Sequence, residues 1–246
     1  MKVSRNEMNT ALKRAYEGAG YNIGDYEDAA EQITWAQMCG FDVFSEIIFP
    51  PLPPKGSATP QLIFEGDGVA VIDAGGAHVC QYGSFAGYLA FSKSLKEGLA
   101  TVQLANCCMP KLILRSLSLI AQRGVYLSVY WRDKQGEHGA SFESGSDFPN
   151  YWSVSSTDNV PATCSSTVTI LCTSKPALLA DAVARQQECL NLSTLQLSCS
   201  RLAANYEKAL QNGIEVNTEK WNALNAAAWP ILVPATKQSR DGAGPG

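Results

Sequence analysis

The amino-acid sequence predicts an α/β fold in which an N-terminal helical hairpin precedes a mixed β-sheet with packed helices, followed by C-terminal helices. Helix-type and strand-type apolar patterns alternate through the middle of the chain, and glycine or proline stands between them. This alternation is typical of a sheet covered by helices. Hydrophobic residues make up 46% of the 246 residues and charged residues 17%. Such a composition supports a buried core and excludes disorder.

The helical hairpin is predicted at residues 1–48. Ser4 and Glu7 have the spacing of a capping box, and apolar residues then recur at intervals of three and four along one helical face. A second helix is expected to start near Asp25 and to end at Gly40, where glycine adopts a left-handed C-cap without strain.

A proline-rich connector at residues 49–60 is predicted to separate the hairpin from the sheet. The run Pro50–Pro54 can neither continue a helix nor join the interior of a sheet. The mixed-sheet core is expected at residues 61–175, and it opens with a β-hairpin around the turn 65–68. The helix that follows is predicted to bury one apolar face, made by Tyr82, Phe85, Ala86, Leu89 and Leu95.

The rest of the core is predicted to alternate in the same way, with a helix from Pro110 to Gly124. Strands are expected at residues 99–105, 125–131, 138–143 and 167–172. The polar stretch 144–166 has no clean period and is expected to be a long loop with at most one short strand. His138 opens a strand after a tight turn, which indicates an ordinary edge position.

C-terminal helices are predicted at residues 176–236, and Asn217 is placed to cap one of them. The final ten residues, 237–246, are too polar and glycine-rich to fold alone and are expected to form a flexible tail. Arg240 in this tail has two interpretations. Its guanidinium suits bidentate pairing with a carboxylate, but a solvated tail residue is the simpler reading.

Charge and cysteine usage exclude several classes of protein. The net charge of −4 and the pI near 5.3 offer no basic field for nucleic acid or anionic lipid. No stretch has the apolar length of a secretory signal or of a membrane span, so a cytoplasmic protein is predicted. The eight cysteines form no Cys-x-x-Cys pair, which favours small buried thiols over a metal site or a disulfide framework.

Several segments between residues 5 and 130 resemble the type-2 malate/L-lactate/ureidoglycolate dehydrogenase family. They include Ala19–Gly20, the acidic stretch 25–28, Gly40–Asp42, Val71–Gly75, and the helix closed by Gln122–Gly124. The resemblance implies a mixed α/β fold that is not a Rossmann fold, NAD(P) as cofactor, and small 2-hydroxy, 2-oxo or cyclic imino acids as substrates. The whole chain, including Val233–Thr236, looks closer to a shorter bacterial family of unknown function derived from those dehydrogenases.

The resemblance also implies a homodimer, because members of the dehydrogenase family usually work as dimers. Tyr21, Trp35 and Phe41 lie in or near the helical hairpin and are expected to be exposed there. Exposed aromatic side chains often mark a protein interface. We therefore expect a closely packed homodimer.

Two departures from the family remove its histidines. Where the dehydrogenases carry Gly-x-Asp-Ser-His-Gly, whose histidine supplies the proton, this chain reads Gly40–Ser45 with Phe44 at the histidine position. Where they carry an Asn-Ser-Asn-His segment, it reads Leu104–Cys108. The cofactor-holding Gly-Thr-Asn-Pro segment has only Asp158–Pro161 as a distant counterpart. The positions that the resemblance assigns to ligand binding are Asp42, Phe44, Asp73 and Asn106.

The candidates for chemistry each have a functional and a structural interpretation. Cys107 and Cys108 follow a strand, where a helix terminus lowers the pKa of a thiol, but no histidine is recognisable beside them and inert thiols are favoured. His78 enters a helix and could meet a ligand, although a solvated loop histidine is the simpler interpretation. Asp42 and Asp73 could orient a ligand, or serve as a cap and a turn residue.

Three functions remain open at this point. The first is a pseudoenzyme, a degenerate dehydrogenase-like protein that binds a small carboxylate or acts as a partner subunit. The second is a working enzyme, either an NAD(P)-dependent oxidoreductase with an altered proton donor or a thiol-dependent enzyme that uses Cys107 or Cys108. The third is a structural or assembly role. With the acid missing at Phe44, the sequence favours the first.

Overall fold

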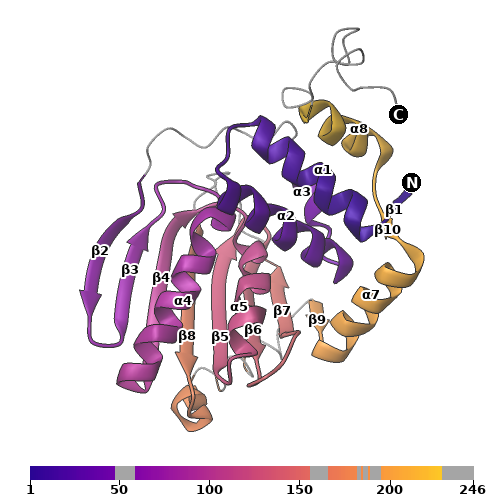
Figure 1. Cartoon of the computed structure of the whole chain (residues 1–246). Helices are drawn as coiled ribbons and strands as arrows, with labels where there is room; N and C mark the ends of the chain where they lie inside the picture. Colours follow the sequence, from indigo (N-terminus) through magenta and orange to yellow (C-terminus); the bar gives the residue numbers. More distant parts are fainter. Residues whose placement is uncertain (48–58, 156–165, 182–183, 185–187, 189–194, 229–246) are drawn as a thin grey trace, which may run out of the picture.

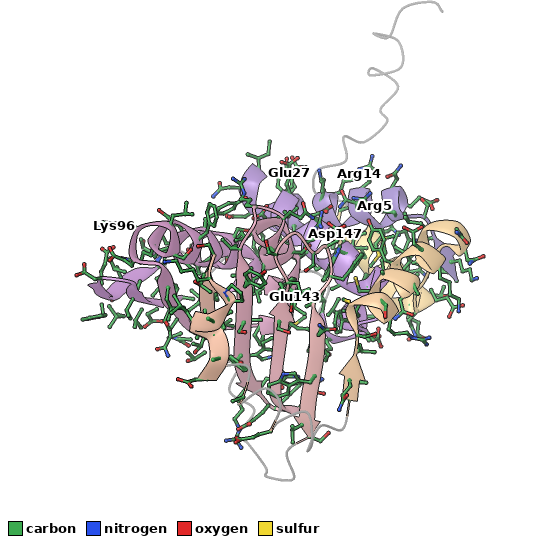
Figure 2. All side chains as sticks on the ribbon, turned by 90° about the horizontal axis from the view of Figure 1, so that it is seen from below. Arg5, Arg14, Glu27, Lys96, Glu143 and Asp147 are labelled. Atoms are coloured by element: carbon green, nitrogen blue, oxygen red, sulfur yellow. The ribbon has the colours of Figure 1, made fainter. Side chains whose placement is uncertain are left out.

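The computed structural model of the protein describes residues 1–47, 59–155, 166–181, 184, 188 and 195–228. Most of the predicted connector and the whole of the predicted tail, with Arg240, lie outside these residues, as does Asp158–Pro161. In the described part, helices lie on one face of an eight-stranded mixed sheet (Figure 1). Figure 2 shows that Arg14 and Glu27 project from the outer side of this helical layer, away from the sheet.

The N-terminal hairpin forms as the local pattern predicts. Helix α1 (Arg5–Gly18) is opened by the capping box, in which the Ser4 N–H donates to Glu7 Oε2 at 2.7 Å and the Glu7 N–H donates to Ser4 Oγ at 3.2 Å. Helix α2 (Ile23–Met38) packs on α1, and a single turn, α3 (Val43–Glu46), follows it.

The eight strands run in the order β2-β3-β4-β8-β5-β6-β7-β9. Strands β3 and β4 are parallel and the other neighbours are antiparallel. The predicted hairpin, the buried strand and the short strand within the polar stretch are all confirmed. The bounds are β2 (Gln61–Gly66), β3 (Val69–Asp73), β4 (Leu99–Cys107), β5 (Tyr126–Asp133), β6 (Gly136–Phe142), β7 (Asn150–Ser155), β8 (Ser166–Thr173) and β9 (Leu195–Leu197).

Two helices cover the middle of the sheet, α4 (Val79–Glu97) and α5 (Ile113–Ala121), the second preceded by the 3-10 turn η1 (Pro110–Leu112). The predicted apolar face of α4 is wrong at two of its five residues, whereas Ala86 is buried and Tyr82 and Leu89 pack partly buried against the core. Phe85 and Leu95 are 55% and 65% exposed, and the buried positions are mostly small, namely Val79, Cys80, Gly83, Ala86, Gly87, Ala90 and Ser94. The reason is close packing, because a Cβ on Gly87 would lie 2.6 Å from Ile120 Cδ1.

The predicted exposure of the hairpin aromatics is also wrong for two of the three residues. Trp35 and Phe41 are 3% and 4% exposed. The Trp35 ring stacks on Phe148, with centroids 5.9 Å apart, and the Phe41 ring meets the edge of Tyr151 at 5.0 Å. Both covering rings come from the stretch that follows β6, so the sequence near the hairpin gave no sign of them.

The C-terminal part contributes α7 (Cys199–Asn212) and α8 (Thr218–Ala227), after a short 3-10 helix, η2 (Pro176–Leu179). Strand β10 (Ile214–Glu215) pairs with β1 (Lys2–Val3) in a second small sheet. The predicted cap on α8 is confirmed, since Asn217 Oδ1 accepts from the Lys220 N–H at 3.0 Å. None of the helices in the described ranges has both the length and the apolar character needed to cross a bilayer.

A glycine in β6 offers a test of the sheet packing. A Cβ on Gly139 would overlap the Trp152 ring, which lies flat across it from β7. Because overpacking forces neighbours off their rotamers, we expect Gly139→Ala to lower the free energy of unfolding by about 1–3 kcal/mol in chemical denaturation. Gly24→Ala is the matched control, since nothing lies within 4 Å of its Cβ. It should be neutral or slightly stabilising, and equal stability of the two variants would contradict the packing argument.

Candidate functional site

The segment where the resemblance places a proton donor is residues 41–46. Phe44 is 1% exposed and packs in the core, and its backbone N–H donates to Gln37 Oε1 at 3.0 Å. Asp42 is exposed, and its Oδ1 accepts from Ser45 Oγ at 2.8 Å. The Phe44 side chain is a hydrocarbon with no ionisable group. It therefore cannot donate a proton at this position.

The ends of the parallel strands β3 and β4 bring Asp73 and Asn106 together. Asp73 Oδ1 accepts from the Gly75 N–H at 2.8 Å, which fixes a turn. Asn106 has a φ of 54°, in the left-handed region that asparagine tolerates better than most residues, and its carbonyl accepts from the Gly76 N–H at 2.7 Å. Asp73 and Asn106 thus shape the loops at the ends of β3 and β4. The other two predicted ligand residues, Asp42 and Phe44, lie at α3 instead.

His78 is the N-cap of α4 rather than a solvated loop residue. It is half-buried, and its Nδ1 accepts from the Cys80 N–H at 3.4 Å. Burial lowers the pKa of this imidazole from its ordinary value of 6.5 to about 4, because a low-dielectric environment disfavours the cation. His78 is therefore neutral at pH 7 and acts as an acceptor.

The strand ends do not fit the pyrophosphate of a nicotinamide nucleotide. A helix N-terminus binds phosphate through free N–H groups, but here the Val79 N–H donates to Cys108 O at 2.9 Å and the Gln81 N–H to His78 O at 3.0 Å. The Cys80 N–H is taken by His78 itself. Neither loop, 73–80 or 104–109, contains lysine or arginine.

The two candidate thiols have the geometry of inert groups. Cys107 is fully buried, its Sγ lies 3.4 Å from Ser166 O, and burial raises the pKa of its thiol to about 12. Cys108 is half-buried, with its Sγ 3.5 Å from Gly76 O. Because the thiolate is the nucleophile, Cys107 in particular is not activated. Among the described residues, no group of histidine, cysteine and carboxylate side chains has the arrangement of a metal site.

The placement of His138 corrects the sequence prediction. Strand β6 lies between β5 and β7, so His138 is an interior-strand residue with 3% exposure rather than an edge residue. His138 is interior because the polar stretch after β6 folds back as strand β7 and pairs with the outer edge of β6.

His138 is held in a buried polar cluster that sequence reasoning missed. Its Nε2 lies 2.9 Å from Asp133 Oδ1 and its Nδ1 lies 2.7 Å from Tyr151 Oη. The Trp131 ring stacks on the imidazole, with centroids 5.3 Å apart and an interplanar angle of 8°. We call Asp133, His138 and Tyr151 the acid–base cluster. One signal was present in the sequence, since Asp133 and His138 flank a tight turn and thus lie near each other across a hairpin.

Burial raises the pKa of both the Asp133 carboxyl and the Tyr151 phenol, but their other interactions give opposite net shifts. Burial alone raises the pKa of Asp133, but the hydrogen bond and charge of His138, the Gln135 N–H and the charge of Lys111 together lower it below its ordinary value. Burial raises the pKa of Tyr151, and the hydrogen bond from Ser153 offsets this only in part. At neutral pH, Asp133 is therefore a carboxylate and Tyr151 a neutral phenol.

Two side-chain contacts link the acid–base cluster and its turn to the segment 41–46. The Phe41 ring touches Tyr151, and Glu46 Oε1 accepts from Gln135 Nε2 at 3.2 Å, next to Asp133 in the turn. Lys111 Nζ lies 3.6 Å from Glu46 Oε1. The segment 41–46 thus meets the acid–base cluster through Tyr151 and the turn that precedes His138.

Comparisons with solved structures show which known fold this is. Malate dehydrogenase from Pyrococcus horikoshii matches with a TM-score of 0.66 at 13% identity, covering 96% of this chain and 97% of that one. Sulfolactate dehydrogenase from Methanocaldococcus jannaschii gives 0.63 at 12% identity, covering 92% and 96%. Delta1-piperideine-2-carboxylate reductase from Pseudomonas syringae gives 0.59 at 11%, covering 92% and 99%.

The fold is that of the malate/lactate dehydrogenase-like structures. This confirms the fold that the sequence resemblance implied. A family model described as "Protein of unknown function (DUF3726)" matches residues 3–48. No curated protein matches the chain.

The depressed pKa of His78 predicts how stability depends on pH. In the unfolded chain His78 takes up a proton near its ordinary pKa of 6.5, whereas the folded state resists protonation down to about 4. The unfolded state binds more protons in that window, so folded stability falls as the pH is lowered through it. His78→Asn keeps a capping oxygen and removes this titration. Its free energy of unfolding should fall less than that of the wild type between pH 7 and 4.5, and parallel pH profiles would exclude the effect.

Proposed function

We propose that this chain is a catalytically degenerate, dehydrogenase-like protein that binds a small carboxylate as a binding or partner subunit. The observation that carries the proposal is Phe44, a buried hydrocarbon side chain at the position of the family's proton donor. A positioned acid typically contributes about a hundred- to ten-thousandfold to such a reaction. The internally bonded amides at the start of α4 add to this, because they leave the nucleotide without donors at that helix.

The class of ligand is supported by the similar structures. Malate, sulfolactate and piperideine-2-carboxylate, which appear in the names of three of them, are all carboxylates. In this chain Lys111 is a cation between residues 41–46 and the acid–base cluster. Its Nζ is 3.6 Å from Glu46 Oε1, an ion pair longer than a direct hydrogen bond, and we infer that a ligand carboxylate competes with Glu46 for this ammonium.

The second candidate is an oxidoreductase with an altered proton donor, and one observation favours it. His138 lies in a buried hydrogen-bonded cluster whose Tyr151 meets the Phe41 ring, and its imidazole and the Tyr151 phenol are groups able to transfer a proton. The same assay separates the two candidates. Nicotinamide turnover that is abolished by His138→Gln would favour this second function.

Binding without turnover is the expected result for the purified protein. Pyruvate or another small 2-oxo acid should raise the melting temperature, because a ligand held at 100 times its Kd stabilises the folded state by about 2.7 kcal/mol. Absorbance of NADH or NADPH should not fall with pyruvate, oxaloacetate or a cyclic imino acid.

Lys111→Gln is the matched variant for this assay. It should lose the thermal shift while keeping the ligand-free melting temperature, since Glu46 is partly exposed and tolerates the loss of its partner. Turnover of about one per second or faster, within the ordinary enzymatic range, would contradict degeneracy. Failure of every carboxylate to shift the melting temperature would contradict the binding function.

We further propose that the chain forms a homodimer. The proposal no longer depends on the hairpin aromatics, two of which are buried, but on exposed apolar residues elsewhere. Exposed apolar side chains gather on β2 and α4, which lie toward one end of the sheet (Figure 1), and they include Leu62, Ile63, Phe64, Phe85, Tyr88 and Leu95. Monomers rarely expose apolar patches of this kind.

Light scattering at micromolar concentration should therefore give twice the chain mass of 26.4 kDa. Ile63→Lys, on the end strand β2, should shift the protein toward monomer. Leu195→Lys, at an exposed position on the opposite end strand β9, should not. A monomeric wild-type mass would remove the proposal.

A further inference from the structure

A groove of about 350 Å³ lies between helices α1 and α8, which pack against each other (Figure 1). Small-molecule sites in proteins measure about 300–1,000 Å³, so the groove suits a small ligand. Its polar lining residues are Asn6, Glu7, Thr10, Arg14 and Asn225, and Trp221 adds an aromatic ring. The groove is separate from the segment 41–46 and from the acid–base cluster, because it shares no lining residue with either.

The small two-stranded sheet holds the two helices together. Strand β1 leads into α1 and β10 leads into α8, and the two strands pair antiparallel. The Met1 ammonium donates to Val216 O at 2.9 Å, and the Val216 N–H donates to Met1 O at 2.9 Å. Each helix then starts at its own side-chain cap, Ser4 for α1 and Asn217 for α8. The groove is therefore formed by two anchored helices rather than by loops.

Opposite charges stand at the two ends of the groove. Glu7 and Arg14 lie seven residues apart on one face of α1, which separates their Cα atoms by about 10.5 Å along the helix axis. They do not pair with each other. The Glu7 carboxylate accepts from the Ser4 N–H, and Arg14 is exposed, with neither a hydrogen bond nor an ion pair to any described residue. The neighbouring cation Lys13, by contrast, pairs with Glu27 at 3.1 Å.

The two charged groups remain available to a ligand at neutral pH. Hydrogen bonds with the backbone N–H and the hydroxyl of Ser4 lower the pKa of the Glu7 carboxyl below its ordinary value. A carboxylate has about four acceptor sites, so a ligand ammonium can bind Glu7 without breaking the cap. The Arg14 guanidinium is a permanent cation with five N–H donors.

Ala11 and Trp221 give the groove its apolar part. Ala11 lies between Glu7 and Arg14 along α1, and it lines the groove. The Trp221 ring is half-buried and packs against the core, and Asn225 Nδ2 donates to the Trp221 carbonyl at 2.9 Å. Methylene groups pack well on such a ring, and its face also attracts an ammonium.

We propose that the groove between α1 and α8 binds a linear zwitterion, a small molecule with an ammonium and a carboxylate at opposite ends of an aliphatic chain. The ammonium binds Glu7, the carboxylate binds Arg14, and the methylene groups cover Ala11 and Trp221. A simple anion would meet the Glu7 carboxylate, and a simple cation would meet the Arg14 guanidinium. A molecule that carries both charges satisfies both ends, and its binding does not depend on the carboxylate site proposed at Lys111.

The distance between the two charges selects the length of the ligand. An extended chain covers about 3.3–3.6 Å for every three bonds, so the six bonds from the nitrogen to the carboxylate carbon of 6-aminohexanoate span about 7 Å. Hydrogen bonds of about 2.9 Å at both ends extend this reach to about 13 Å. That reach covers two helical turns and the bend of Glu7 back toward Ser4. Glycine, whose charges stand on adjacent carbons, is too short.

Calorimetric titration of the full chain with 6-aminohexanoate tests the site. Glycine, hexanoate and hexylamine should each bind at least about fivefold more weakly, because each loses one of the two ion pairs. Glu7→Gln, which keeps a capping side chain, and Arg14→Gln should each weaken 6-aminohexanoate by about fivefold, the upper end of the range for an exposed ion pair. Both side chains are exposed, so the melting temperatures should stay near that of the wild type. Lys13→Gln is the matched control, since Lys13 does not line the groove.

Nuclear magnetic resonance locates the bound probe. The chain has five tryptophans, and Trp221→Leu identifies the indole N–H signal of Trp221 in ¹⁵N-tryptophan-labelled protein. Added 6-aminohexanoate should shift this signal more than the other indole signals.

Several results would overturn the proposal. They are no binding of 6-aminohexanoate by the wild type, equal binding of hexanoate or hexylamine, and an affinity unchanged in both Glu7→Gln and Arg14→Gln. An equal loss of affinity in Lys13→Gln would also overturn it, because the probe would then respond to the net charge of the helix rather than to this groove.

Discussion

The pairing of β6 between β5 and β7 is the constraint on which the candidate site depends. It places Trp131, His138 and Ser153 in one row across three strands, and Tyr151 in the next row on the same face. A slip of one residue would turn every one of these side chains to the other face. Gly139 and Trp152 oppose such a slip on the opposite face of the sheet. The Trp152 indole packs against Gly139 there, in space that any other residue would fill with its Cβ. The geometry of the imidazole is thus set by backbone register.

The parts of the fold that the sequence predicted are those encoded locally. The capping box at Ser4 and Glu7, the turn between β2 and β3, and the Asn217 cap each depend on residues a few positions apart. The errors all involve partners distant in sequence. Trp35 is covered by Phe148, and the interior place of His138 depends on β7. The inward face of α4 was misjudged because close helix packing selects small residues there, not the largest apolar ones.

The candidate site was harder to predict than the fold for a related reason. The aromatic residue at position 44 can be read from the sequence, whereas the partners of His138 come from β5 and β7 and depend on strand pairing. Residues 41–46 meet the surroundings of the acid–base cluster through contacts of Phe41 with Tyr151 and of Gln135 with Glu46. A shared fold with dehydrogenases therefore says little about chemistry, which depends on the particular side chains that the fold brings together.

The backbone at the ends of β3 and β4 limits the space for a ligand at this edge of the sheet. His78 and Cys108 form an isolated parallel bridge, so the ladder between the two strands continues past the point where open α/β sheets usually leave a crevice. Main-chain bonds such as Cys108 N–H to Ala77 O, at 3.0 Å, close it. A histidine substituted for Phe44 would supply an acid but would open nothing at this edge. A crevice here would require the two loops to give up their main-chain hydrogen bonds, which no single side-chain substitution achieves.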